Sequence, residues 1–174
     1  TKTRNATLLA SGTQHYLTAT TLLSLSCSTA TANDTPLTNA LNIPPTNPNS
    51  PAILQSLNHA VDRNHRKAIT TLAHILLTGI HLCDEDDTTS AVLTFPRNAT
   101  RAEHLLVKGV GRADATAAYS LAVWRSSRLA PSTRFDLTPA QHALAQARAT
   151  GLFIAAAVAG SVEGRLALAH RHTS

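Results

Sequence analysis

The chain has 174 residues and a net charge of +5, and 43% of its residues are hydrophobic. This length suits a single domain that buries a core, and the hydrophobic content excludes a wholly disordered chain. Because aromatic residues make up only 3%, the core must be filled mainly by Leu, Ala, Ile and Val, which favours closely packed helices over a sheet.

The first 50 residues are expected to form an N-terminal arm. A short helix is predicted near residues 6–26, where Leu9, Tyr16 and Leu23 are spaced seven residues apart. The segment that follows holds five prolines between positions 36 and 51 with many Asn and Thr, which is typical of an irregular loop. Because the chain contains no Met, we expect a processed or fragmentary product that has lost any targeting segment, and the localisation stays open.

Residues 51–174 are expected to form a helical domain. Ser50 and Pro51 are typical of an N-cap and a first helical position. Apolar residues then recur at three- and four-residue spacing from Ile53 to Ile80, interrupted only by the polar segment DRNHRK over residues 62–67. They predict one long helix over residues 51–82 that ends near Gly79, before the acidic run at 84–87.

The second half of this domain contains further helical patterns. Residues 88–96 predict a connector rather than a strand, because the segment is short and solitary. Helices are predicted at 99–108, 112–128 and 138–158, the last capped by Asp136 or Thr138, and a continuation to about residue 170 stays open. The predicted fold class is all-α, a bundle of four to five helices with an irregular Thr/Pro/Asn-rich N-terminal arm, and no apolar run is long enough to span a membrane.

Two cysteines, Cys27 and Cys83, lie 56 residues apart. This spacing is not that of a metal site and favours two buried thiols, although a disulfide stays open. Asn5, Asn33 and Asn98 lie in N-x-T sequons, close to the number expected by chance in a Thr-rich chain with nine Asn. A bridge and glycosylated sequons together would indicate a secreted helical glycoprotein.

Positive charge is concentrated in the C-terminal part of the chain. Residues 97–174 hold ten of the fifteen Lys and Arg but only four of the ten Asp and Glu, and nine of these ten basic residues are Arg. Arg suits contacts with phosphates and with acidic partner surfaces. The pattern therefore predicts contact with nucleic acid or an acidic protein, with an ordinary basic surface as the plainer alternative.

The stretch 104–119 reads HLLVKGVGRADATAAY and places a glycine turn between two Ala-rich helical segments. With its flanks, the segment over residues 100–121 resembles the helix-hairpin-helix motif of DNA-repair and DNA-processing proteins. The resemblance implies sequence-nonspecific DNA binding, in which glycine amides approach a phosphate and basic side chains flank it. The residues that it implies are Lys108, Gly109, Gly111 and Arg112.

Some features of this stretch depart from the motif. Lys108 stands where the family commonly has proline, and Asp114 places a carboxylate in the first turn of the second helix, whose first buried position would be Ala115. The plain alternative is a corner between two helices with Gly109 as a left-handed cap.

An enzymatic alternative uses Arg97 and His104. The segment RNATRAEH over residues 97–104 resembles the motif of HEPN ribonucleases, which are also all-α. The resemblance implies that Arg97 stabilises the charge of a phosphorane and that His104 acts as acid and base. Because no nucleophile elbow, P-loop or pair of carboxylates accompanies it, the chain is expected not to be an enzyme.

His74 and His81 share a face of the predicted helix, and His81 lies near Asp84 and Glu85, so a metal site is a further alternative. No second pair of ligands at i, i+4 spacing supports it. Histidines satisfied by water or by a neighbouring helix are the simpler interpretation, and we expect no metal and no cofactor.

Together these features favour a non-enzymatic structural or assembly subunit of a larger complex, including a nucleoprotein particle of coat-like or ribosome-like type. Its partners would be other protein subunits in a homo- or hetero-oligomer, with nucleic acid contacted through the Arg-rich C-terminal half. A DNA-binding protein, a HEPN-like ribonuclease and a secreted helical glycoprotein stay open as alternatives.

Overall fold

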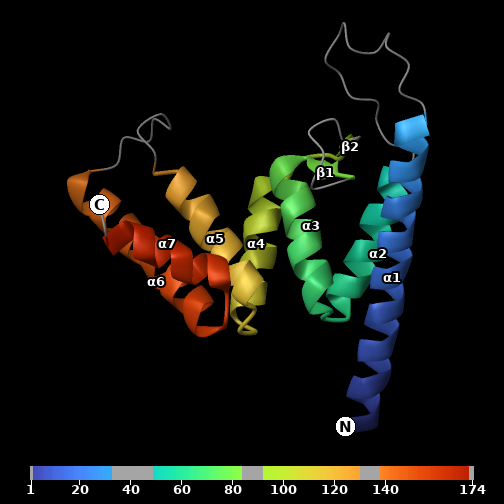
Figure 1. Ribbon diagram of the computed structural model, residues 1–174. Coiled ribbons are helices and arrows are strands. Elements are labelled where there is room, and N and C mark those ends of the chain that lie inside the picture. The colour runs from blue at the N-terminus through green and yellow to red at the C-terminus, as the bar shows by residue number, and fades with distance from the viewer. Residues whose placement is uncertain (1, 33–48, 84–91, 130–137, 173–174) are drawn as a thin grey trace, which may run out of the picture. The chain divides into compact units, whose positions relative to one another are not determined.

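A computed structural model describes residues 2–32, 49–83, 92–129 and 138–172 (Figure 1). Within these ranges the chain forms seven helices and two three-residue strands, so the predicted all-α fold class is confirmed. None of the helices in the described ranges is long and apolar enough to cross a membrane. The chain divides into two compact units, residues 1–102 and 103–174, which are described separately.

The first unit contains α1 (Lys2–Ala32), α2 (Ser50–Asp62), α3 (Arg66–Thr78), β1 (Ile80–Leu82) and β2 (Val92–Thr94). Helix α1 extends beyond the short helix predicted near 6–26 at both ends. It lies along α2, and α2 packs on α3 (Figure 1). Residues 33–48 of the predicted arm lie outside the described residues.

The prediction of one helix over residues 51–82 is wrong, because the chain turns between α2 and α3. Asn64 adopts a left-handed conformation with φ 65°, which Asn tolerates better than most residues. The buried face of the segment is nevertheless as expected. Its fully buried members include Ile53, Leu57, Leu72 and Ile75, whereas Ile80 is exposed.

Helix α2 begins differently from the sequence expectation. Its N-cap is Asn49 rather than Ser50, and the Asn49 side chain does not bond to the helix. Instead Asn49 Nδ2 donates to Ser26 Oγ of α1 at 3.0 Å, and Ser50 Oγ donates to the carbonyl of Thr94 at 3.0 Å. These two side chains therefore connect the start of α2 to α1 and β2.

The segment predicted as a connector contains a strand. β2 pairs with β1 in an antiparallel register that sets Ile80 opposite Thr94. Gly79 makes this possible, because its φ of 73° ends α3 in a left-handed turn that leads directly into β1. The segment was expected to be a connector because its pairing strand, β1, is separated from it in the sequence by residues 84–91. Those residues are outside the described ones.

Cys27 and Cys83 form a disulfide, with their Cα atoms 5.3 Å apart. The expectation of two buried thiols is therefore wrong. The bridge joins the C-terminal part of α1 to the residue that follows β1.

The second unit contains most of α4 (Ala99–Val110), which begins in the first unit, together with α5 (Ala115–Ser127), α6 (Pro139–Val158) and α7 (Val162–His172). Thr138 caps α6 in a capping box with Gln141, whereas Asp136 lies outside the described residues. The continuation that the sequence left open is a separate helix, α7, which follows a turn at Gly160 with φ 102°. The buried side chains of the unit are small or aliphatic apart from Phe153: Leu105, Leu106, Ala117, Ala118, Leu121, Ala122, Ala149 and Ala156.

Candidate functional sites

The glycine turn at 108–112 lies at the end of α4. Gly109 is buried inside the last turn of the helix, and Gly111 is the first residue after it. The residue with positive φ is Ala113, at 55°, so Gly109 is not the left-handed cap that the plain alternative expected. Ala115 is only half-buried, and the first fully buried alanine of α5 is Ala117.

The backbone amides of this turn are already bonded to carbonyls of α4. Gly111 N donates to Val107 O at 3.0 Å, and Arg112 N donates to Gly109 O at 2.9 Å. Ala113 N and Asp114 N donate in the same way, to Val110 O and Gly109 O. A phosphate at this turn would have to compete with these bonds.

The N-terminus of α5 is capped by Asp114. One oxygen of its carboxylate accepts hydrogen bonds from Thr116 N at 3.0 Å and Ala117 N at 3.1 Å. A negative side chain therefore occupies the place where free amides of a helix N-terminus would bind an anion. The sequence predicted Asp114 in the first turn of a helix over residues 112–128. In the structure the helix begins at Ala115, so Asp114 is its N-cap, a position that Asp prefers.

Several arginines of the basic C-terminal part serve the fold. Arg125 makes a two-nitrogen contact with Glu103 Oε1 at 3.0 and 3.1 Å, and Arg128 lies 3.9 Å from the other oxygen of that carboxylate. Arg171 donates to Thr150 and Ser126, and its guanidinium lies 4.7 Å from the ring centre of Phe153. Part of the Arg excess is thus a means of joining α4, α5, α6 and α7.

The two residues of the ribonuclease alternative have separate surroundings. Arg97 precedes α4, as its sequence context indicated, and its Nε donates to Leu77 O at 3.1 Å. His104 is an exposed residue of α4. Neither observation supports a catalytic role.

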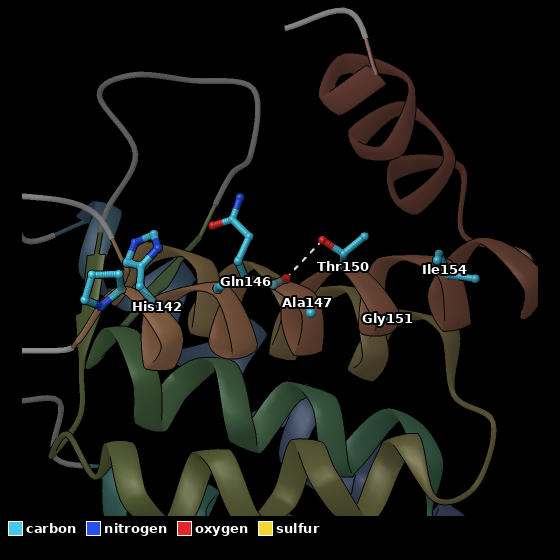
Figure 2. Close-up of a pocket in the computed structure, with 8 residues that line it drawn as sticks. His142, Gln146, Ala147, Thr150, Gly151 and Ile154 are labelled. Atoms are coloured by element: carbon cyan, nitrogen blue, oxygen red, sulfur yellow. Dashed lines mark hydrogen bonds between the residues drawn. The ribbon is translucent and has the colours of Figure 1, made fainter.

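An open hollow of about 790 Å³ runs along one face of α6 (Figure 2). Residues at helical spacing line it: Pro139, His142, Ala143, Gln146, Ala147, Thr150, Gly151 and Ile154. Thr150 Oγ1 donates back to Gln146 O at 3.0 Å, so its hydroxyl is satisfied within the helix. Among these lining residues His142 is the only one with an acid–base side chain, so they offer no acid–base pair.

A cluster of rings joins the three helices of the first unit and was not found from the sequence. His15 of α1 lies against His59 of α2, with ring centres 5.2 Å apart, and Tyr16 stacks on His65 at 4.5 Å. His65 Nδ1 also accepts a hydrogen bond from Ala68 N at 3.3 Å and so caps α3. Burial and, to a smaller extent, the nearby Lys67 charge lower the pKa of His65, which favours the neutral ring that this cap needs.

No group of three or more His, Cys, Asp or Glu side chains within the described ranges could hold a metal ion. Asp84 and Glu85, two of the residues weighed with His81 as ligands, lie outside those ranges.

In comparisons with known proteins, no family model, no curated protein and no solved structure matches the chain. Its function is therefore inferred from its own residues.

Proposed function

We propose that the chain is a non-enzymatic structural subunit that assembles with a second copy of itself through one face of α1. The observation that carries the proposal is the absence of formal charge from residues 6–32 of α1, on a helix with one exposed face. Between Asn5 and Asn33 the sequence contains no Lys, Arg, Asp or Glu. α1 has 31 residues and is about 46 Å long at 1.5 Å per residue.

The outer face of α1 is formed by residues at helical spacing, all of them exposed: Ala10, Thr13, Gln14, Leu17, Thr18, Thr21 and Leu25. Leu17 and Leu25 are 58% and 57% exposed, whereas a helix that faces only water usually carries charged side chains there. Exposed leucines on a face without formal charge are compatible with a contact surface.

The threonines of the outer face make burial easier. The hydroxyls of Thr13, Thr18 and Thr21 donate to backbone carbonyls four residues earlier, at 2.9–3.0 Å. Their donors are satisfied within the helix, so they present methyl groups, and covering this face would leave neither a charge nor these hydroxyls unpaired.

The net charge of the chain does not prevent contact with an identical partner at this face. Two copies that each carry a net charge of +5 repel one another wherever their basic surfaces meet. The outer face of α1 offers a contact without that repulsion, and a two-fold arrangement places the same face on both sides.

The test is the mass of the whole chain in solution, measured by light scattering over a range of concentrations. We expect a dimer that Leu17→Glu converts to a monomer, because the contact would bury two unpaired carboxylates. Leu144→Glu on α6 is the matched control, since Leu144 is 53% exposed, and this variant should remain a dimer. A wild-type chain that stays monomeric at every concentration would refute the proposal.

The Cys27–Cys83 bridge favours a second candidate, the secreted helical glycoprotein. Structural disulfides persist in oxidising compartments and are rare in the cytosol. This candidate is compatible with assembly through α1, and it places the subunit in an oxidising, extracytosolic compartment. It predicts that the chain, produced through a secretory pathway, contains no free thiol, and a secreted chain with two free thiols would refute it.

DNA binding through Lys108, Gly109, Gly111 and Arg112 stays a prediction, and the Asp114 cap does not favour it. It requires an affinity that falls steeply with salt and falls further in the Lys108→Ala/Arg112→Ala variant. Unchanged binding in that variant would remove it. The ribonuclease alternative likewise requires an RNA cleavage that His104→Ala abolishes.

A further inference from the structure

The sequon Asn98-Ala99-Thr100 lies at the start of α4, after the short segment that follows β2. Asn98 and Thr100 are both exposed. The site lies in the first unit, on a segment that carries no buried side chain between Phe95 and Ala102. An acceptor asparagine and the hydroxyl two residues later are therefore both accessible from solvent.

The hydrogen bonds of Asn98 involve its backbone N and its Oδ1, and not Nδ2, the atom to which a sugar would be attached. Its backbone N donates to Leu76 O at 2.9 Å, and its Oδ1 accepts from Arg101 N at 3.0 Å, which caps α4. Within the described part of the chain, its Nδ2 makes no hydrogen bond. Modification at Nδ2 keeps Oδ1 as an acceptor, so the helix cap and a sugar can coexist.

We propose that Asn98 is an N-glycosylation site of the folded, disulfide-bonded chain; the proposal rests on the secreted-protein candidate above. A sequon alone does not identify a glycosylated asparagine, but this sequon is exposed and belongs to the unit that holds the disulfide. The lumen that oxidises Cys27 and Cys83 in a eukaryotic secretory pathway is also the compartment in which asparagine side chains receive oligosaccharides.

The modification is a group transfer from a lipid-diphosphate-linked oligosaccharide. A bond forms between Asn98 Nδ2 and the anomeric carbon of the first sugar, and the bond from that carbon to the diphosphate breaks. The lipid diphosphate leaves with the bonding electron pair, and Nδ2 loses one proton to the transferase. No oxidant or reductant is required.

Three variants separate the modification from the role of Asn98 in the fold. Asn98→Asp keeps an oxygen that caps α4 but removes the amide nitrogen, since Asp is as good an N-cap as Asn. Thr100→Ala keeps Asn98 and removes the hydroxyl that completes the sequon. Thr100→Ser restores a hydroxyl and is the matched positive control.

The experiment uses the whole chain, secreted from a eukaryotic cell behind a cleavable signal. The peptide that contains residues 98–100 is weighed before and after treatment with an amidase that removes N-linked glycans. We expect a glycan there in the wild type and in Thr100→Ser, and none in Asn98→Asp or Thr100→Ala. Helix content measured by circular dichroism should be the same in all four proteins.

Two failures are distinguishable. A secreted chain with the Cys27–Cys83 bridge intact and an unmodified Asn98 would overturn this inference alone. A chain that is secreted with both thiols free would overturn the secreted-protein candidate, and the inference with it.

Discussion

The two units of the chain are held together by different kinds of interaction. In residues 1–102, segments far apart in the sequence are joined by the Cys27–Cys83 disulfide and by the bonds that Asn49 and Ser50 make to α1 and β2. In residues 103–174, the helices approach closely through alanines, and an ion pair joins Glu103 to Arg125.

The two units should therefore respond to different changes. Oxidation of two thiols stabilises the first unit, so its stability depends on the redox state of the compartment. The second unit depends on small side chains that let helices approach, so it should be sensitive to added volume. Each prediction below changes one unit and uses the other as a reference.

The largest effect is expected from removal of the disulfide. The bridge spans 56 residues, and opening a loop of that length lowers the free energy of unfolding by about 4 kcal/mol through the entropy of the unfolded chain. Cys27→Ser/Cys83→Ser should therefore shift the unfolding transition of the first unit to much lower denaturant concentration, measured by circular dichroism.

The second unit supplies the control for this experiment. Trp124 is the only Trp of the chain and lies on α5, so its fluorescence reports unfolding of residues 103–174. We expect the fluorescence transition to stay where it is in the double variant. If both transitions shift together, the two units unfold as one and the comparison between them fails.

A smaller loss is expected from Gly164→Ala in the second unit. A Cβ atom at Gly164 would lie 3.0 Å from the Cβ of Ala156 and 3.0 Å from the backbone nitrogen of Ala157. Neither atom can move without displacing α6, so the added methyl should lower the free energy of unfolding by about 1–3 kcal/mol. Denaturant unfolding followed by Trp124 fluorescence measures this loss.

Gly151→Ala is the matched control on α6. A Cβ atom there would meet nothing within 4 Å, and Gly151 lies inside the helix. Alanine is the better helix former by about 1 kcal/mol, so this variant should be more stable than the wild type. Equal losses in the two variants would mean that close contact at Gly164 does not decide the result.

Local patterns in the sequence predicted much of the fold. The apolar spacing from Ile53 onward identified a face that is buried, and Thr138 was among the residues expected to cap α6. The break at Asn64 was missed because the polar segment over residues 62–67 was taken as an interruption within one helix, since Val61 and Ala68 on its two sides keep a helical spacing. Gly12 and the many threonines weaken the helical pattern, and only a short helix near residues 6–26 was predicted. In the structure α1 has 31 residues and packs against α2.

The features that depend on distant contacts could not be read from local patterns. The β1–β2 pair is only three residues long on each side, and the two cysteines are 56 residues apart, so neither pairing leaves a signal in its own neighbourhood. The ring contacts of His15 and Tyr16 fall in the same class. Asp114 was expected in the first turn of the helix, whereas its role as N-cap depends on the amides of Thr116 and Ala117 that it binds.

The smallest effect concerns pH and again distinguishes the first unit. Burial, helped by Lys67, lowers the pKa of His65 below 6.5, and Tyr16 of α1 stacks on its ring. The unfolded chain therefore takes up the proton first, so the contribution of His65 to stability is complete above pH 6.5 and is lost as pH falls through its folded pKa.

His65→Asn keeps a cap on α3 without a titrating group, and it should reduce the loss of first-unit stability below pH 6.5, measured by circular dichroism. Some loss should remain, because burial also lowers the pKa of His74. His142→Asn, in the second unit, should leave the pH dependence of the first unit unchanged, and an equal change in both variants would show that the His65 cap is not its source.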